Sequence, residues 1–576
     1  MFEKARRLAK QLALENAAKY GKASEKAVIG KLLANMPELK SEIEKAIEIT
    51  REAVKEVNKL PIDEILKMIK PTRRKAEKKE RIWPELENAD KYEKIVTRVA
   101  PEPNGYPTIG HAKGLLVPFI YARIYNGVFQ LRFEDTNPRV ERREYYDAIR
   151  EEFAILLEAA ESELGLAPGK WDVEIIESND FPIMYRLAEK LINDHNAYVC
   201  TCPTANIRKN RRLGIECSCR KRSIEENMEL WGKMHSELRE GEACLRLKTD
   251  MKHLNPTMRD PAIFRIIEAP HPLHGDKYRV YPTYDFSIAV EDSRTGVTHA
   301  FRSKEFEPHV EVQKTILKML GLRTYEMIQF GRLTIEGLPL SKRYIRPLVK
   351  TKILWGWDDP RIPTLRGLFR RGITPNAIVR FIYEQGPSKV DATIRIENIA
   401  AINRKILDLK AKRLMFVPDP IKLIIENTPE KLEAEIWFHP STKKLGKRRI
   451  ILGSKNGMIE VYIAQRDLKS FGEGENIRLR DLCNVQILSI MPDMARGRYL
   501  PEKDLRVPII QWAPTDGVPV VVYQPETAYS YRVIGGIGEK YIKNLEIGEI
   551  VQFIRFGFVR VDKIEDGTVR TIYSHP

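Results

Sequence analysis

Residues 95–111 combine a strand-like run, a tight turn and the start of a helical pattern. The strand-like run covers residues 95–99, the turn covers residues 101–105, and Thr108, Gly110 and His111 lie where the helical pattern begins. Gly105 and Gly110 leave room for a phosphate or a purine beside the backbone, and the free amides of a helix start attract anions. This segment therefore predicts an α/β unit that binds a nucleoside triphosphate at the turn after a strand.

Strand-like and helical runs alternate further along the chain. From residue 94 to about residue 191, strand-like runs at 95–99 and 128–133 alternate with helical runs at 114–125 and 143–160. Such alternation predicts a parallel sheet covered by helices. After residue 416, short alternating stretches such as 459–463, 519–523 and 550–561 are separated by Asn-Gly, Gly-Gly and Asp-Gly turns. This spacing predicts one or two antiparallel β-barrels.

Residues 5–60 have a helical pattern of their own, with a break near Pro37. Ile43, Ile47, Val54 and Val57 recur at the spacing of one helix face. We therefore expect a separate helical domain. Residues 70–81 are basic and poor in apolar side chains, which is typical of an exposed linker; contact with a nucleic-acid backbone is the alternative.

The charge balance of the chain is strongly basic. Its 576 residues carry a formal net charge of +17, and 31% of them are charged. No apolar run approaches the ~20 residues of a membrane span, and the amphipathic start of the sequence is unlike an export signal, so we expect a cytoplasmic protein without membrane contact. The positive surplus favours nucleic acid as a partner, and a solvated basic surface explains it equally well.

A second motif, residues 339–343, is a short basic loop that follows an apolar stretch. In this loop Lys342 and Arg343 come directly after Ser341. A lysine there suits the stabilisation of a leaving pyrophosphate, because phosphoryl transfer depends on positioning and charge neutralisation. Such a loop alone is usually a solvated turn, and a histidine at a helix start is usually a cap. Together, on either side of an α/β core, the two motifs predict ATP chemistry.

The order of these motifs resembles the class I aminoacyl-tRNA synthetases, and within them the glutamyl and glutaminyl group. The barrel-like tail resembles that of glutaminyl and archaeal-type glutamyl enzymes, and the helical N-terminus resembles that of the archaeal glutamyl form. Bacterial glutamyl enzymes end in helices instead. The matching segments run in the family's order and are residues 98–106, 108–113, 132–138, 281–286, 296–299, 340–343 and 356–361.

The resemblance implies a multidomain α/β fold with a Rossmann-like catalytic core. We expect an N-terminal helical domain with its linker at 1–85, the first half of the core at 86–192 and an inserted domain for the tRNA acceptor stem at 193–280. The second half of the core, with the loop that contains Lys342, is expected at 281–350. A helical domain that contacts the tRNA stem is expected at 351–415, and antiparallel β-barrels that bind the anticodon are expected at 416–576.

The resemblance also implies a two-step reaction. The carboxylate of L-glutamate attacks the α-phosphate of ATP, which binds with Mg²⁺, and the glutamyl group then passes to the 3′ end of tRNA(Glu); whether tRNA(Gln) is also charged stays open. The enzyme is expected to act as a monomer without a covalent intermediate, with His111, Lys342 and Arg343 as catalytic residues. The expected ATP-binding residues are Glu102, Pro103, Asn104, Thr108, Ile109, Gly110, His111, Lys113, Arg332, Leu333, Leu340, Ser341 and Lys342.

The residues expected to bind the amino acid are Arg98, Asp135, Tyr284 and Arg302. By resemblance Asp135 holds the α-ammonium group, although residues 135–138 in isolation read equally well as a helix cap and a turn. Arg302 occupies a position at which glutamyl enzymes carry an arginine, and a guanidinium forms paired charge-assisted hydrogen bonds with a carboxylate but not with an amide. We therefore expect glutamate as the substrate. The alternative is an ordinary ion pair of Arg302 with Glu305 or Asp292.

Departures from the family pattern leave two other functions open. Thr108 replaces the first histidine of the first motif, Leu340 replaces a methionine of the second, and residues 303–306 resemble glutaminyl sequences. Ile288, by contrast, stands where glutaminyl enzymes have a histidine. A glutamine–tRNA ligase is the alternative enzyme, and a tRNA-binding paralogue without catalysis is the alternative of another class.

Four of the six cysteines form two close pairs, Cys200 with Cys202 and Cys217 with Cys219. Four thiolates in a cytosolic protein favour a closed tetrahedral Zn²⁺ site over disulfides, and free thiols are the alternative. Some bacterial glutamyl enzymes bind zinc in this region through similar pairs. We therefore expect a structural zinc ion, while the isolated Cys244 and Cys483 are expected to be packing residues.

Three basic clusters are candidates for contact with tRNA phosphates, which would make binding strongly salt-dependent. A solvated surface is the alternative for each of them. The clusters are Arg208, Lys209, Arg211 and Arg212; Arg366, Arg370 and Arg371; and Lys443, Lys444, Lys447, Arg448 and Arg449.

Overall fold

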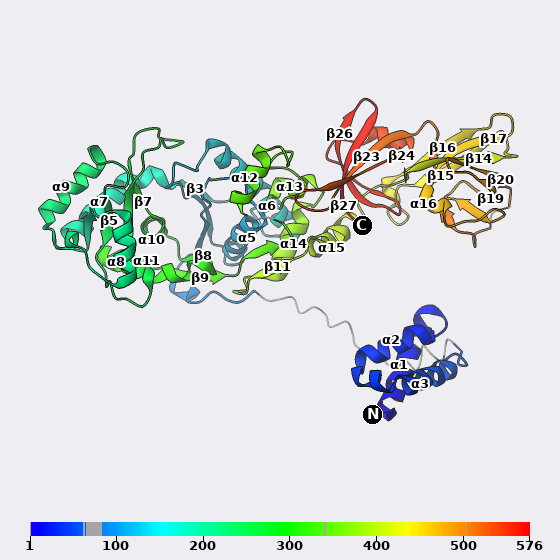
Figure 1. Ribbon diagram of the computed structural model, residues 1–576, viewed down its shortest axis with the longest axis horizontal. Coiled ribbons are helices and arrows are strands. Elements are labelled where there is room, and N and C mark those ends of the chain that lie inside the picture. Colours follow the sequence, from blue (N-terminus) through cyan, green and yellow to red (C-terminus); the bar gives the residue numbers. More distant parts are fainter. Residues whose placement is uncertain (1, 62–63, 65–82, 339–340, 503) are drawn as a thin grey trace. The chain divides into compact units, whose positions relative to one another are not determined.

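The computed structural model describes residues 2–61, 64, 83–338, 341–502 and 504–576 (Figure 1). The basic segment 70–81 and Leu340 of the second motif lie outside these residues. The chain divides into two compact units, Met1–Pro84 and Glu85–Pro576. The predicted appended domain is therefore a unit with its own core.

Three helices form the first unit: α1 (Phe2–Tyr20), α2 (Glu25–Asn35) and α3 (Ile43–Val57), with a turn of 3₁₀ helix at Pro37–Glu42 that explains the break near Pro37. Val54 and Val57 are buried as predicted, but Ile43 is 46% and Ile47 is 38% exposed. The buried face of α3 includes small residues such as Ala46 and Ala53. Ile43 lies in the first turn of the helix, and Ile47 lies at the edge of the buried face.

The second unit begins with the predicted alternation of parallel strands and helices. Three strands form a parallel sheet in the order β1-β2-β3: β1 (Val96–Val99), β2 (Val128–Phe133) and β3 (Val173–Ile176). Two helices connect them along the chain, α5 (Ile109–Ile124) and α6 (Arg143–Leu164). β8 (His299–Ser303) pairs in parallel with β9 (Glu326–Phe330). The backbone N–H of Val96 donates to Thr298 Oγ1 at 2.9 Å, and the Thr298 N–H donates to Val96 O at 2.9 Å, so the two halves of the core meet at β1.

An antiparallel domain lies between the two halves in the sequence. Its strands have the order β4-β5-β6-β7. Its elements are α7 (Phe181–Asn193), β4 (Ala197–Cys200), α8 (Thr204–Leu213), α9 (Ile224–Ser236), β5 (Cys244–Leu247), β6 (Ala262–Ile266) and β7 (Val280–Pro282).

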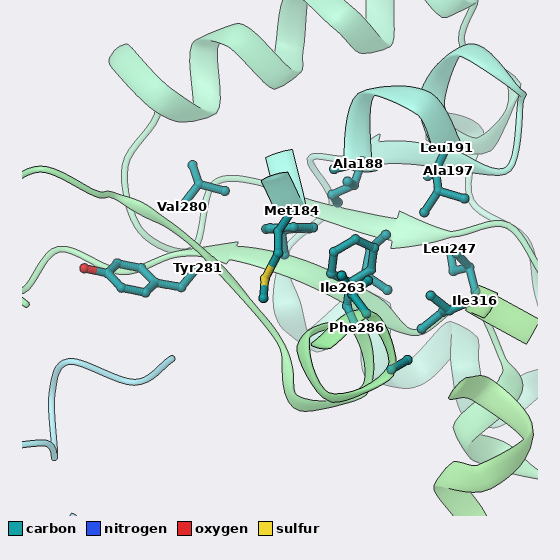
Figure 2. Packing of buried hydrophobic residues seen from close by; sticks show 14 of the residues in the cluster. Met184, Ala188, Leu191, Ala197, Leu247, Ile263, Val280, Tyr281, Phe286 and Ile316 are labelled. Atoms are coloured by element: carbon teal, nitrogen blue, oxygen red, sulfur yellow. The ribbon is translucent and has the colours of Figure 1, made fainter. Parts of the chain in front are cut away.

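This inserted domain shares one hydrophobic core with the second half of the catalytic core. Figure 2 shows Met184 of α7 and Ile263 of β6 packed with Phe286 of α10 (Tyr284–Arg294) and Ile316 of α11 (Val310–Leu320). The four side chains are completely buried. The packing therefore holds the insertion firmly on α10 and α11.

The remaining helices follow the second half of the core. β10 (Leu333–Ile335) pairs in parallel with β11 (Ala392–Ile394), and α14 packs against α6. The helices are α12 (Lys342–Lys350), α13 (Leu365–Arg370), α14 (Pro375–Gln385) and α15 (Ile396–Leu407).

The C-terminal region contains two seven-stranded sheets and the hairpin β15-β16, as the barrel prediction requires. One sheet has the order β21-β18-β19-β20-β14-β17-β22 and the other β12-β25-β26-β27-β23-β24-β13. Most pairs are antiparallel, but four are parallel: β14 with β20, β18 with β21, β23 with β27 and β12 with β25. β12 and β13, at the start of this region, pair with β25 and β24 near its end, so the second sheet joins the two ends of the C-terminal region.

The bounds of these strands and of one short helix are β12 (Arg413–Leu414), β13 (Phe416–Pro418), β14 (Pro420–Glu426), β15 (Lys431–Trp437), β16 (Lys447–Gly453), β17 (Met458–Ala464), α16 (Gln465–Leu468), β18 (Asn476–Leu479), β19 (Cys483–Ile490), β20 (Met494–Leu500), β21 (Ile509–Ile510), β22 (Ala513–Pro514), β23 (Val518–Pro525), β24 (Tyr531–Gly538), β25 (Ile550–Phe553), β26 (Gly557–Glu565) and β27 (Thr568–His575). Among the helices in the described parts of the chain, none has the length and apolar character to cross a membrane.

The shared core predicts the effect of truncating Ile263. Ile263→Ala should lower the free energy of unfolding by about 2–5 kcal/mol, because it leaves a cavity between β6 and the catalytic core. Leu254→Ala is the matched control in the same domain, since Leu254 is 94% exposed, and should change stability by less than about 0.5 kcal/mol. Urea denaturation measures both. Equal effects of the two variants would contradict the packing described above.

Candidate functional site

A cavity of about 620 Å³ opens at the carboxyl ends of β1, β2 and β8, where ligands of open parallel sheets usually bind. Ten of the predicted site residues line it: Arg98, Thr108, Gly110, His111, Lys113, Tyr284, Arg302, Arg332, Leu333 and Ser341. A second cavity of about 490 Å³ is lined by Asn104, Val140, Lys342, Arg343, Arg346, Pro347 and Lys350. The lining of neither cavity includes Glu102, Pro103, Ile109 or Asp135.

The start of α5 gives His111 two roles. The backbone N–H of Thr108 donates to His111 Nδ1 at 3.1 Å, so the ring caps the helix. Because Nδ1 accepts this bond, the ring proton resides on Nε2. Burial and the Lys342 ammonium lower the pKa of His111 to about 3, so the ring is neutral near pH 7. His111 therefore offers the cavity one neutral N–H donor.

Lys342 reaches across the first motif. Its Nζ donates to Asn104 Oδ1 and lies 3.4 Å from Gly105 O. A Cβ atom at position 105 would lie 2.7 Å from Lys342 Cδ, so a larger residue there would require the end of the lysine side chain to shift. Burial lowers the pKa of Lys342 to about 8, whereas burial raises the pKa of Glu102, whose Oε2 accepts from Asn104.

The second motif continues as a cationic face of α12. Arg343 and Arg346 are exposed and line the second cavity with Lys350, while Ile345 on the opposite face is buried. Arg346 also donates to Asn104 O at 3.3 Å. The two predicted motifs therefore meet at Asn104, and the positive charges of α12 face the second cavity.

The Asp292 carboxylate on α10 organises the other side of the first cavity. Arg98 donates to it through Nε and Nη2 at 2.9 Å each, and Nη2 of Arg132 lies 2.9 Å from its Oδ1. Nη2 of Arg302 donates to its Oδ2 at 3.0 Å. Although burial alone would raise the pKa of Asp292, the guanidiniums of Arg98 and Arg132 hold it well below its ordinary value. One ionised carboxylate is thus shared by three guanidiniums.

Arg302 combines the two alternatives that the sequence left open. It forms the ion pair with Asp292, and it also lines the cavity with its side chain only 3% exposed. Glu305, the other partner considered, pairs instead with Arg332. Asp292 was identified from the sequence only as an alternative partner, and neither Arg132 nor Asp292 was predicted to contribute to the site.

The structure places Asp135, the acidic residue expected to bind the amino acid, outside the lining of the cavity. Asp135 accepts hydrogen bonds from Tyr146 Oη at 2.8 Å and from the N–H and Oγ of Ser178 at 2.8 and 2.7 Å, and is completely buried away from the cavity. The cavity is lined by Glu134 instead. Strand alternation explains the correction, because Asp135 follows Phe133 onto the face that Tyr146 of α6 covers. Burial raises the pKa of Asp135 to about 7.

Two other predicted residues in the cavity have defined partners. Lys113 Nζ donates to Gly331 O at 2.6 Å, which ties α5 to the segment after β9. Tyr284 begins α10, and burial raises the pKa of its hydroxyl, so it stays uncharged.

The four paired cysteines come together as predicted. The sulfur atoms of Cys200, Cys202, Cys217 and Cys219 all lie within 4.8 Å of one another. The sulfurs of Cys200 and Cys217 are 3.8 Å apart, and those of Cys202 and Cys219 are 3.7 Å apart. A tetrahedral metal with bonds of about 2.3 Å requires sulfur separations of about 3.8 Å. The four sulfurs are therefore close enough together to bind one metal ion.

Several cations from the basic clusters have structural partners within the protein. Arg366 donates to Glu152, Arg370 to both Asp562 oxygens at 2.8 Å, and Arg448 to both Glu539 oxygens at 2.6 Å. Arg211 donates to Arg259 O at 2.9 Å. These four residues are thus engaged in the fold, whereas Arg208, Lys209 and Arg212 on α8 are exposed.

Comparison with known proteins gives matches along nearly the whole chain. Residues 94–409 match the family described as tRNA synthetases class I (E and Q), catalytic domain, and residues 411–502 and 509–562 match two anti-codon binding domains of that class. The glutamate–tRNA ligase of Korarchaeum cryptofilum is 60% identical over 100% of both chains. The glutamate–tRNA ligases of Pyrococcus furiosus and Sulfolobus acidocaldarius are 41% and 39% identical, over 99% and 100% of both chains respectively.

Proposed function

The chain belongs to the class I tRNA synthetases specific for glutamate and glutamine, and from this premise we propose that it is a glutamate–tRNA ligase. It joins glutamate to AMP at the expense of ATP, releases pyrophosphate and transfers the glutamyl group to tRNA. The observation that supports glutamate as the substrate, beyond membership of the family, is the charge at the cavity: three guanidiniums share the single carboxylate of Asp292. An acidic amino acid supplies the anion that this arrangement lacks.

The nucleotide side of the site acts by positioning and by fixed donors. ATP enters with Mg²⁺, which offsets part of the phosphate charge. The amides at the start of α5 and the Nε2–H of His111 would hold phosphate oxygens, and Lys342 would stabilise the pyrophosphate as it leaves. Each of these groups has its position fixed before the substrate binds, so little reorganisation is needed during the reaction.

The amino-acid side of the site selects by charge. Arg302 would bind the side-chain carboxylate of glutamate, and Glu134 replaces Asp135 in our proposal for the α-ammonium group. Burial raises the pKa of Glu134, with Arg132 opposing this effect, and a bound ammonium would favour the ionised form. Arg98 and Tyr284 complete the polar lining. Glutamine lacks the negative charge that this lining favours.

The ligase proposal is tested by charging purified tRNA(Glu) and tRNA(Gln) with labelled glutamate and glutamine. We expect glutamate on tRNA(Glu), and Arg302→Ala should lower kcat/KM for glutamate about 100-fold, equivalent to ~2.8 kcal/mol. Glutamate on tRNA(Gln) would identify the non-discriminating form. Preferential charging with glutamine, or no tRNA-dependent exchange of pyrophosphate into ATP, would contradict the proposal. The monomeric state and the cytoplasmic location remain predictions.

The pKa values of Lys342 and His111 predict the pH profile of activation. Because Lys342 has a pKa of about 8 in the free protein and acts as a cation, kcat/KM for ATP should fall as the pH rises through about 8. His111, with a pKa of about 3, should cause no inflection near pH 6.5. Lys342→Arg is the control, since its guanidinium stays charged: the variant should lose the decrease above pH 8. A decrease that persists in this variant would exclude Lys342 as its origin.

We also propose that the four paired cysteines bind one structural zinc ion. The support is the sulfur geometry, together with Arg246, whose Nη1 lies 3.7 Å from Cys200 Sγ and 3.9 Å from Cys217 Sγ and would offset the negative charge of four thiolates. The cluster joins the end of β4 to the short 3₁₀ helix Ser218–Lys221, which Cys217 precedes and which contains Cys219. Zinc would thus stabilise the inserted domain at a point next to α8.

Elemental analysis of the purified protein tests the zinc proposal. We expect about one zinc ion per chain, and Cys217→Ser should remove most of it and lower the melting temperature. Cys483→Ser is the matched control, because Cys483 lies in β19, far along the chain from the cluster, and should keep the zinc. Wild-type protein without zinc after expression in zinc-supplemented medium would contradict the proposal.

A further inference from the structure

Gln313 of α11 lies beneath the first cavity and is completely buried. Its Oε1 accepts a hydrogen bond from Nη1 of Arg302, and its Nε2 donates to Oδ1 of Asp285 at 3.0 Å. A guanidinium can only donate and a carboxylate accepts, so the two partners fix the orientation of the amide. Asp285 is held in turn by His309, whose Nδ1 lies 2.9 Å from both carboxylate oxygens.

The other contacts of Arg302 show how little of its charge is neutralised. Nη2 donates to Asp292 Oδ2 at 3.0 Å and to Tyr325 Oη at 3.1 Å. Asp292 is shared with Arg98 and Arg132, and both Tyr325 and Gln313 are uncharged. Among the described residues, the buried Nε of Arg302 has no hydrogen-bond acceptor. Its hydrogen-bonded partners thus hold the guanidinium by several contacts but give it only a share of one negative charge.

We propose that Gln313 is a positioning residue that sets the amino-acid specificity of this site. Its amide holds the guanidinium of Arg302 at the cavity and, being uncharged, leaves the guanidinium charge for the carboxylate of an acidic amino acid. A glutamate at position 313 has almost the same shape, but it would neutralise Arg302 and be repelled by Asp285. The inference rests on the proposed activity, and it identifies a second residue, besides Arg302 itself, that distinguishes glutamate from glutamine.

Two variants separate the charge of residue 313 from its hydrogen bond. Gln313→Glu keeps an acceptor for Arg302 and adds a negative charge, whereas Gln313→Met keeps the length of the side chain and removes the acceptor. For both variants and the wild type, kcat and KM are measured for glutamate, glutamine and ATP in tRNA charging. Thermal unfolding of each protein reports on folding.

Gln313→Glu should raise KM for glutamate about 10- to 100-fold, change KM for ATP less than about threefold, and lower the preference for glutamate over glutamine at least about tenfold. Gln313→Met should raise KM for glutamate only about three- to tenfold, because it removes the hydrogen bond that Arg302 donates to residue 313. If Gln313→Glu keeps the wild-type KM for glutamate, or if both variants weaken glutamate and ATP equally, the inference is wrong.

Two further outcomes are decisive. If Gln313→Glu does not fold, Gln313→Met becomes the test. The inference then requires that Gln313→Met raises KM for glutamate more than KM for ATP, and equal changes contradict it. Wild-type protein that does not charge tRNA with glutamate would overturn the proposed function itself. A wild-type enzyme that uses glutamate normally, beside a Gln313→Glu variant that uses it equally well, would overturn only the role of Gln313.

Discussion

The carboxylate of Asp292 is the group on which the arginine-lined side of the cavity depends. It lies on α10 and binds guanidiniums from three strands, Arg98 on β1, Arg132 on β2 and Arg302 on β8. None of these side chains is more than 5% exposed. Buried charges are costly unless they are paired, so the four groups fix one another's positions. Because β1 and β2 belong to one half of the core and β8 to the other, this network also joins the two halves at the cavity.

The meeting of residues 101–111 with the loop that contains Lys342 depends on a different contact, the close passage of Lys342 over Gly105. This contact brings together two motifs that are far apart in the sequence, and the buried surroundings that it creates lower the pKa values of both His111 and Lys342. The histidine is therefore a neutral donor, while the lysine keeps a charge that depends on pH. The shared hydrophobic core around Ile263 and Phe286 holds the inserted domain on the same framework.

The sequence was sufficient to predict those parts of the structure that depend on local pattern. Strand, turn and helix around residues 95–111, the antiparallel C-terminal sheets and the grouping of four cysteines are all encoded by short-range spacing. Glu134, which lines the cavity, was not predicted because it is adjacent to another acidic residue, Asp135. Strand alternation would have placed Asp135 on the same face as Phe133, against α6. Gln313 could not be found in this way, since its role arises from a contact between α11 and β8 that spacing does not encode.

The most direct test of this account is the free energy of unfolding of Asp292→Asn, measured by urea denaturation near pH 7. The variant keeps the shape of the side chain but leaves three buried guanidiniums without their shared negative charge. We expect a loss of about 3–5 kcal/mol relative to the wild type. Since the folded-state pKa of Asp292 is depressed, the wild-type advantage is present above the unfolded-state pKa and should decline as the pH falls towards the folded-state value. A loss below about 1 kcal/mol near pH 7 would contradict the central role of this carboxylate.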